Sequence, residues 1–268
     1  MEENDAKYDP RIRRAKLKPH KDSSFQKIVA VVSGKGGVGK SFVTSLLAVS
    51  LMNEGHKVSI MDADITGPSI SKTFGEDSYT CMGDKEGIFP AKTSRGLTLI
   101  SSNNLLDDPT TPIVWRGSLI SSLVAQMFTE VVYGEKEFLL IDMPPGTGDV
   151  PLTVFQQLPI DGIVIVTSPQ DLVSEVVTKS IKMAKMMNVK ILGVVENMAY
   201  VKCPHCGEEI PLFGKDNVQD LLKNMNVSLL DRLGIDPALT SLIDEGKIEE
   251  YKGNDLKNTV QAVTNLLK

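Results

Sequence analysis

The residues with the clearest chemical capacity lie in one short segment, residues 34–41. In chain order they are Gly34, Lys35, Gly36, Gly37, Val38, Gly39, Lys40 and Ser41. The segment matches the phosphate-binding pattern G-x-x-x-x-G-K-[ST] at every fixed position. Glycines let successive backbone N–H groups turn inward around an anion, Lys40 can reach the β- and γ-phosphates, and the Ser41 hydroxyl can ligate Mg²⁺. We therefore expect these residues to cradle the phosphates of a nucleotide.

Carboxylates end two apolar runs elsewhere in the chain. Asp62 and Asp64 follow the run that starts at Lys57, and Asp142 ends the run from Phe138. Because ligands of parallel sheets bind beyond the carboxyl ends of the strands, these groups should lie near the phosphates. Asp64 could orient or deprotonate water, and Asp142 would hold the Mg²⁺ shell through water. For Asp62 and Asp64 the alternative is an acidic turn at a strand end.

A rigid loop follows Asp142. Residues 143–149 read Met-Pro-Pro-Gly-Thr-Gly-Asp, so prolines stiffen the turn and glycines allow close backbone approach. Such a loop can sense whether a γ-phosphate is present.

A cysteine pair forms a second candidate site. Cys203 and Cys206 have C-x-x-C spacing, and the third cysteine, Cys81, lies far away in sequence. A [4Fe–4S] cluster or a structural zinc ion usually needs four ligands, so the count favours two chains that each supply two thiolates. Thiol–disulfide exchange also uses this spacing, but it needs a helix after the first cysteine. Cluster binding, shared zinc, redox chemistry and an inert pair remain open from the residues alone.

Alternating apolar segments must position these groups. We predict strands over 28–32, 57–62, 97–101, 138–142, 162–167 and 190–196, and helices that include 41–54, 117–132 and 171–188. Near-continuous apolar strands that alternate with helices predict a doubly wound α/β fold, mostly parallel, with helices on both faces of the sheet. Residues 75–96 should contain a short hairpin at most, and residues 199–214 should form an irregular insertion.

Length and composition limit the function further. The chain has 268 residues, a net charge of −5 and no membrane-length apolar run. With no apolar segment near the N-terminus and few cysteines, we expect a cytoplasmic protein without membrane attachment. Residues 1–24 are predicted to form a flexible basic arm, with seven Lys or Arg between residues 7 and 21, and residues 25–268 the nucleotide-binding domain. Nucleic-acid binding is not expected, since only this arm is basic.

Lys35 makes the phosphate loop more specific. It adds a second cation where charge accumulates during phosphoryl transfer, although a solvated loop lysine is the alternative. The pattern Lys-Gly-Gly-x-Gly-Lys-[Ser/Thr] resembles the deviant Walker A loop of the MinD/ParA-like ATPases. That resemblance implies a dimer in which Lys35 reaches the nucleotide of the other subunit. Phe42 stands where the family usually has a threonine that contacts the α-phosphate, so this contact is absent here.

Longer segments resemble the Mrp/ApbC branch of these ATPases, from about Lys27 to Glu250. The similar segments are 62–69, 115–117, 142–149, 167–170 and 195–198. Members of this branch are iron–sulfur cluster carriers. The resemblance implies that Asn197 contacts the adenine ring and that Cys203 and Cys206 bridge a [4Fe–4S] cluster between two subunits.

The combined expectation is a homodimeric ATPase that transfers a cluster to apoproteins. The alternative is a positioning or partitioning ATPase with a structural zinc site. A nitrogenase-type reductase fits less well, because its cluster cysteines are widely spaced.

Overall fold

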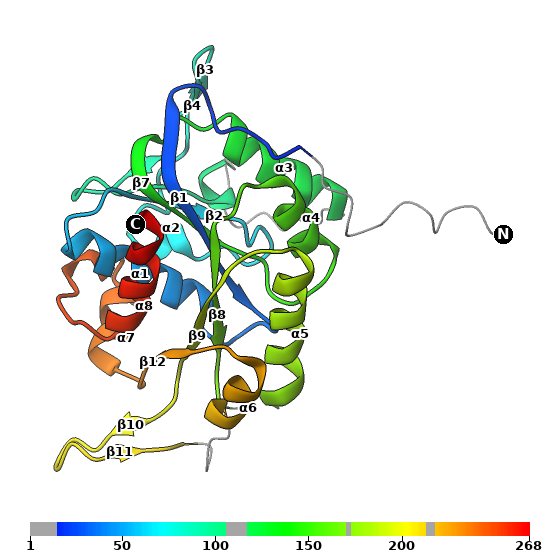
Figure 1. The fold of residues 1–268 in the computed structure, drawn as a ribbon. Coiled ribbons are helices and arrows are strands. Elements are labelled where there is room, and N and C mark those ends of the chain that lie inside the picture. Colours follow the sequence, from blue (N-terminus) through cyan, green and yellow to red (C-terminus); the bar gives the residue numbers. More distant parts are fainter. Residues whose placement is uncertain (1–14, 106–116, 170–172, 213–217) are drawn as a thin grey trace.

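The structure is a computed structural model that describes residues 15–105, 117–169, 173–212 and 218–268. An eight-stranded sheet runs through the molecule in the order β12-β9-β8-β1-β7-β2-β6-β5 (Figure 1). All neighbouring strands pair in parallel except β5 and β6, which are antiparallel. The strands of this sheet are β1 (Ser23–Ser33), β2 (Val58–Asp62), β5 (Ala91–Lys92), β6 (Thr98–Ile100), β7 (Gly134–Asp142), β8 (Gly162–Thr167), β9 (Ile191–Glu196) and β12 (Leu229–Arg232).

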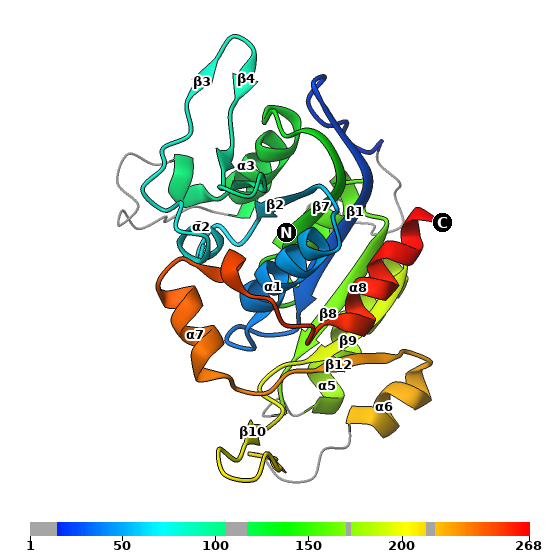
Figure 2. The same ribbon diagram turned by 90° about the vertical axis from the view of Figure 1, so that its left-hand side faces the viewer.

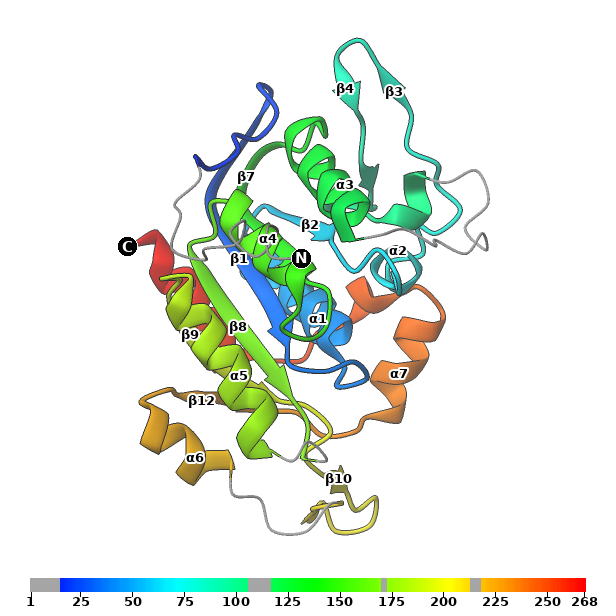
Figure 3. The ribbon, with the colours of Figure 1, turned by 90° about the vertical axis from the view of Figure 1, so that its right-hand side faces the viewer.

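Helices cover both faces of the sheet (Figures 2 and 3). They are α1 (Lys40–Asn53), α2 (Ile70–Thr73), α3 (Gly117–Thr129), α4 (Asp149–Gln157), α5 (Val173–Met186), α6 (Val218–Met225), α7 (Pro237–Asp244) and α8 (Lys257–Thr264), with 3₁₀ turns η2 (Ser102–Leu105), η3 (Ile248–Glu250) and η4 (Asn265–Leu267). Helices α3 to α6 pack on one face and α1, α2, α7 and α8 on the other. This two-sided cover confirms the predicted doubly wound α/β fold.

The apolar strands explain this arrangement. Along β1, Ile28, Ala30 and Val32 face one hydrophobic core while Val29 and Val31 face the other. Successive side chains of a strand point to opposite faces, so a continuous apolar run needs helices on both sides. β1 therefore lies in the middle of the sheet, and its carboxyl end leads into the phosphate loop.

The six predicted strands are confirmed, but some of their limits are wrong. β1 and β7 begin earlier than predicted because their polar first halves pair with each other, with Ser23 opposite Gly134. The predicted helix from residue 117 ends at Thr129, since Val131 pairs with Ile88. The sequence did not predict β5 and β12; both lie at edges of the sheet and are short.

Two hairpins extend from opposite ends of the molecule (Figure 1). One, β3 (Gly83–Asp84) with β4 (Gly87–Ile88), is the short hairpin expected within residues 75–96. The other, β10 (Val201–Lys202) with β11 (Glu209–Ile210), corrects the expectation of an irregular insertion, since two residues of each strand pair. No described helix is long and apolar enough to cross a membrane.

Candidate functional site

The phosphate loop joins β1 to α1 through left-handed glycines. Gly37 and Gly39 have φ of 83° and 81°, a region that other residues rarely adopt. Gly39 precedes the first residue of α1, and its carbonyl accepts a hydrogen bond from Val43 N at 3.0 Å. The loop therefore ends at a helix N-terminus, where free N–H groups and the helix dipole favour an anion.

Lys40 lies between two carboxylates. Its side chain is buried, and its Nζ lies 2.8 Å from Asp142 Oδ1 and 3.5 Å from Asp64 Oδ2. A buried cation needs such partners because an unpaired charge away from water costs several kcal/mol. The structure thus brings together the lysine and both carboxylates that the sequence selected.

Asp142 also orients the start of α1. The Ser41 hydroxyl donates a hydrogen bond to Asp142 Oδ2, and the Thr44 hydroxyl donates to Oδ1 at 2.8 Å. Thr44 was not predicted as part of the site. Its position three residues after Ser41 places it on the same face of the helix, which is the signal that could have identified it.

Asp62 holds the segment that carries Asp64. Its Oδ1 accepts from Asp64 N at 3.1 Å, and its Oδ2 accepts from Ser69 N at 3.2 Å and from the Ser101 hydroxyl at 3.1 Å. Burial, reinforced by the nearby Asp142 carboxylate, raises the pKa of Asp62 to about 7. Burial also raises the pKa of Asp64, against the opposing effect of Lys40. Asp62 therefore acts on Asp64 through the backbone.

Lys35 and residues 143–149 lie around this centre. Lys35 is exposed, and its carbonyl accepts from the Ser33 hydroxyl at 2.9 Å. Gly146 N donates to Ser33 O at 2.8 Å, so the predicted γ-phosphate-sensing loop is attached to the end of β1. The exposure of Lys35 leaves its side chain accessible to another molecule.

Asn197 packs directly on the phosphate loop. Its buried side-chain amide donates to Val38 O at 2.9 Å, and a Cβ at Gly39 would lie 2.1 Å from Asn197 Nδ2. Beside this contact is a hollow of about 220 Å³. It is lined by Gly39, Phe42, Asn197, Met198, Gly234, Ile235, Asp236, Leu239, Thr240 and Ile243. We call it the base hollow, after the nucleotide base that the family resemblance predicts beside Asn197.

The cysteine pair occupies the turn of the β10–β11 hairpin. Cys203 is half-buried and Cys206 is exposed. Cys203 N donates to Glu208 O at 2.9 Å, and Gly207 N donates to Cys203 O at 2.9 Å. Backbone N–H groups of Cys206 and then His205 lower the pKa of Cys203 by hydrogen bonding to its sulfur. Such donors stabilise a thiolate, the form that binds metals.

Cys81 differs from this pair. It packs against the hydrophobic core on the face of the sheet that α3 to α6 cover, and burial raises the pKa of its thiol to about 11. Among the described residues, no group of three or more His, Cys, Asp or Glu could hold a metal ion. Two thiolates in one chain are therefore short of the usual four ligands.

Comparisons with known proteins agree with these features. A family model, ParA: NUBPL iron-transfer P-loop NTPase, matches residues 24–268. An iron-sulfur cluster carrier protein of Clostridium perfringens is 43% identical over 235 residues, covering 85% of this chain and 82% of the relative. Cytosolic Fe-S cluster assembly factor CFD1 of Kluyveromyces lactis is 38% identical over 251 residues, covering 89% of each.

A solved structure supports the fold. The nucleotide-binding protein of Archaeoglobus fulgidus in complex with ADP superposes with a TM-score of 0.78 at 42% identity, covering 87% of this chain and 91% of that one. Of the segments that carried the Mrp/ApbC resemblance, Trp115, Arg116 and Gln170 lie outside the described residues.

Proposed function

The chain belongs to the ParA family of iron-transfer P-loop NTPases, and on that premise we propose that it is an ATP-hydrolysing carrier of an iron–sulfur cluster. The observation that supports this proposal most directly is the cysteine turn. Cys203 and Cys206 lie in a surface hairpin with backbone N–H groups directed at the Cys203 sulfur. Soft thiolates at this spacing suit iron, and hydrogen bonds to sulfur stabilise bound clusters. Relatives named as cluster carriers add further support.

The nucleotide half of the proposal uses the phosphate loop. Residues 34–41 bind the phosphates of ATP, and Asn197 together with the base hollow receives adenine. Ser41 and Asp142 fit a magnesium ion, because their oxygens already converge beside the loop. That ion, when bound, neutralises charge that develops on the phosphates. Lys40 stabilises the same charge, while Asp64, held by Asp62, orients or deprotonates the water that displaces ADP from the γ-phosphorus.

We further propose that the working form is a homodimer. Two thiolates per chain are half of the usual four cluster ligands, so a cluster on the dimer axis would take both pairs. Lys35 would complete the nucleotide site of the partner. Clients would be apoproteins that accept the cluster, in the cytoplasm, as the name of the Kluyveromyces lactis relative suggests.

Anaerobic reconstitution with iron and sulfide tests this function. The wild type and Cys81→Ser should each bind about one cluster per two chains, because both keep the four thiolates of Cys203 and Cys206 in the dimer. Cys203→Ser and Cys206→Ser should each lose stable cluster, since only two thiolates would remain per dimer. The measurements are the absorption spectrum and the iron and sulfide content per chain.

Nucleotide binding is measured in the same samples and should persist in all of them. A full cluster in either C-x-x-C variant would contradict the assignment of the ligands. If the protein binds zinc and takes up no iron or sulfide, the proposed carrier function is wrong. The protein would then be an ATPase with a structural zinc site.

A further inference from the structure

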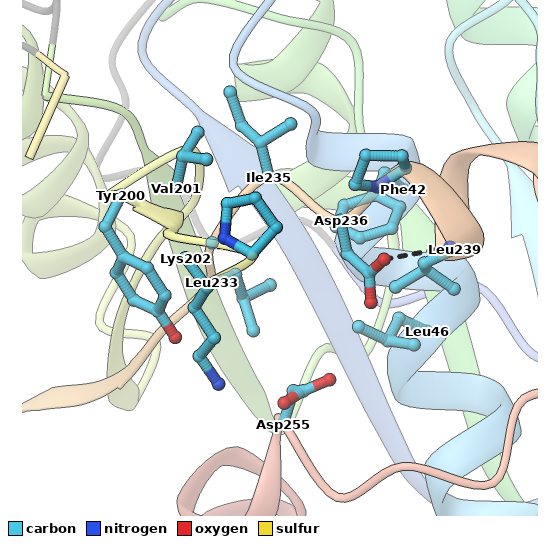
Figure 4. A pocket seen from close by; sticks show the side chains of 13 residues that line it. Phe42, Leu46, Tyr200, Val201, Lys202, Leu233, Ile235, Asp236, Leu239 and Asp255 are labelled. Atoms are coloured by element: carbon cyan, nitrogen blue, oxygen red, sulfur yellow. Dashed lines mark hydrogen bonds between the residues drawn. The ribbon is translucent and has the colours of Figure 1, made fainter. Parts of the chain in front are cut away.

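A second and larger cavity shares Phe42 with the base hollow as a lining residue. Its volume is about 530 Å³. Phe42 and Leu46 of α1 face Tyr200, Val201 and Lys202 of the cysteine hairpin across it (Figure 4). Pro204, which lies between the two cysteines in sequence, also lines it. The cavity therefore separates the start of α1 from the hairpin that carries the thiols.

The base hollow and this cavity share one wall. Phe42, Gly234, Ile235, Asp236 and Leu239 line both spaces. Phe42 directly follows Ser41 and is half-buried, so its ring is attached to the helix turn that ends the phosphate loop. Half of the ten residues that line the base hollow therefore belong to this shared wall.

The root of the hairpin is bonded to the same wall. Ile235 N donates to Tyr200 O at 2.8 Å, and Ile235 pairs with Val201 in an isolated parallel bridge. The fit is close, because a Cβ at Gly234 would lie 2.6 Å from the Tyr200 ring. Residues 234–235 are therefore attached directly to the start of the first strand of the hairpin.

The wall is anchored at its other end by α7. The Asp236 carboxylate caps this helix by accepting from Ala238 N at 2.9 Å and Leu239 N at 3.4 Å. Residues 234–236 thus connect a helix that borders the base hollow to the strand that leads into Cys203. On the hairpin side they adjoin open space, into which the hairpin can shift without displacing packed atoms.

We propose that this shared wall couples nucleotide binding to the cysteine turn. Occupation of the base hollow presses on Phe42 and residues 234–236, fixes the root of the hairpin and reduces access to Cys203 and Cys206. The inference rests on the proposed function, in that it takes the nucleotide base to enter this hollow. Coupling of two sites requires one element whose state both sites change, and residues 234–236 are that element.

Thiol alkylation measures this coupling without a cluster. The background is Cys81→Ser, so that only Cys203 and Cys206 react with iodoacetamide under anaerobic conditions. Saturating Mg-ADP should slow the alkylation by about fivefold or more, the size of a typical allosteric coupling. Phe42→Ala should bring the ratio of rates without and with Mg-ADP close to one, because the side chain between the two spaces is lost.

Two further variants complete the design. Phe42→Leu keeps an apolar side chain and should retain part of the effect. Phe89→Ala removes an aromatic side chain that is 40% exposed in another region, and it should retain the full effect. Each variant is assayed at an ADP concentration well above its own dissociation constant, which is measured with a fluorescent analogue. The thermal unfolding of each variant is also recorded.

The outcomes separate this inference from the proposed function. Absence of ADP binding to the Cys81→Ser protein would overturn the nucleotide assignment itself. Binding of ADP with an unchanged alkylation rate would overturn the coupling alone. If Phe42→Ala binds ADP and keeps the full effect, or if it fails to fold and Ile235→Ala keeps the full effect, the shared wall is not the route.

Discussion

Asp142 is the side chain on which most of the phosphate-site geometry depends. It contacts Lys40 and accepts hydrogen bonds from Ser41 and Thr44, although its carboxylate is fully buried. These contacts hold the lysine and the hydroxyl in place before any ligand binds, and preorganised charge of this kind contributes most to phosphoryl transfer. The site thus depends on a compact group of four residues and on Asp64 beside it.

At the residue scale, Lys40→Ala should lower the rate of ATP hydrolysis by about 10²-fold or more, because it removes a preorganised cation from the transferring phosphate. The fold should persist at reduced stability, because the change removes the cation beside the buried Asp142 carboxylate, which keeps its hydrogen bonds from Ser41 and Thr44. Phosphate release under saturating ATP and circular dichroism measure the two effects. Lys72→Ala, on the exposed face of α2, is the matched control. Wild-type turnover in the Lys40 variant would contradict the assignment of residues 34–41 to the catalytic site.

At the scale of elements, β7 carries a charged group at each end. Asp142 at its carboxyl end belongs to the phosphate site, whereas Lys136 lies near its start and donates to Gly96 O at 3.2 Å. Burial, and then repulsion from Lys92 and Lys57, lowers the pKa of Lys136 from 10.5 to about 8. The first half of the strand is therefore less stable when this lysine is charged.

This lowered pKa predicts a pH-dependent stability. Between pH of about 8 and 10.5 the unfolded chain holds a proton on Lys136 that the folded protein has lost. Stability rises with pH where the unfolded state binds more protons, so this contribution should increase across that window. Lys136→Met should lack it, and Lys85→Met, in an exposed turn, should retain the wild-type profile. Urea unfolding from pH 7.5 to 10.5 measures the difference, and parallel curves for the wild type and Lys136→Met would contradict the assignment.

At the scale of the whole molecule, the proposed homodimer depends on two groups at the surface of one chain. The hairpin offers two thiolates, and Lys35 extends from the phosphate loop with an exposed side chain. Phe42, which follows the phosphate loop, and Pro204, which lies between the two cysteines, both line the large cavity between α1 and the hairpin. A second copy placed against this end could complete both, which is the basis of the proposed homodimer.

Mixing two inactive chains tests this arrangement. Lys35→Ala and Asp64→Ala should each impair hydrolysis when assayed alone. If Lys35 acts on the partner's nucleotide, a mixed dimer has one site with an intact Asp64 and an intact Lys35, so activity should reappear on mixing. If Lys35 acts within its own chain, no mixed dimer has a complete site and activity stays absent. Full turnover of Lys35→Ala alone would reject the sandwich mechanism.

The sequence by itself determined the parts of this protein that depend on local chemistry. Residues 34–41 must turn through glycines and end at a helix, and apolar runs such as Ile28–Val32 need cover on both faces. For the same reason the sequence alone predicted that Asp64 and Asp142 lie at strand ends. It also gave the spacing of the two cysteines. Adenine contact by Asn197 remains a prediction. Of the predicted flexible arm, residues 1–14 lie outside the described structure, whereas Ser23 and Ser24 belong to β1 and Leu17 N donates to Gln157 O at 2.8 Å.

Only the tertiary structure decided what depends on segments that meet across the fold. The hydrogen bond from Ser101 to Asp62, the packing of Asn197 on Gly39, and the addition of β12 to the sheet all join residues far apart in sequence. β12 is short and only partly apolar, so its sequence pattern does not identify it as a strand. It forms a strand because it pairs with β9. The wall between the base hollow and the cavity likewise combines α1 with residues 234–239, because hydrophobic packing selects neighbours by shape rather than by sequence distance.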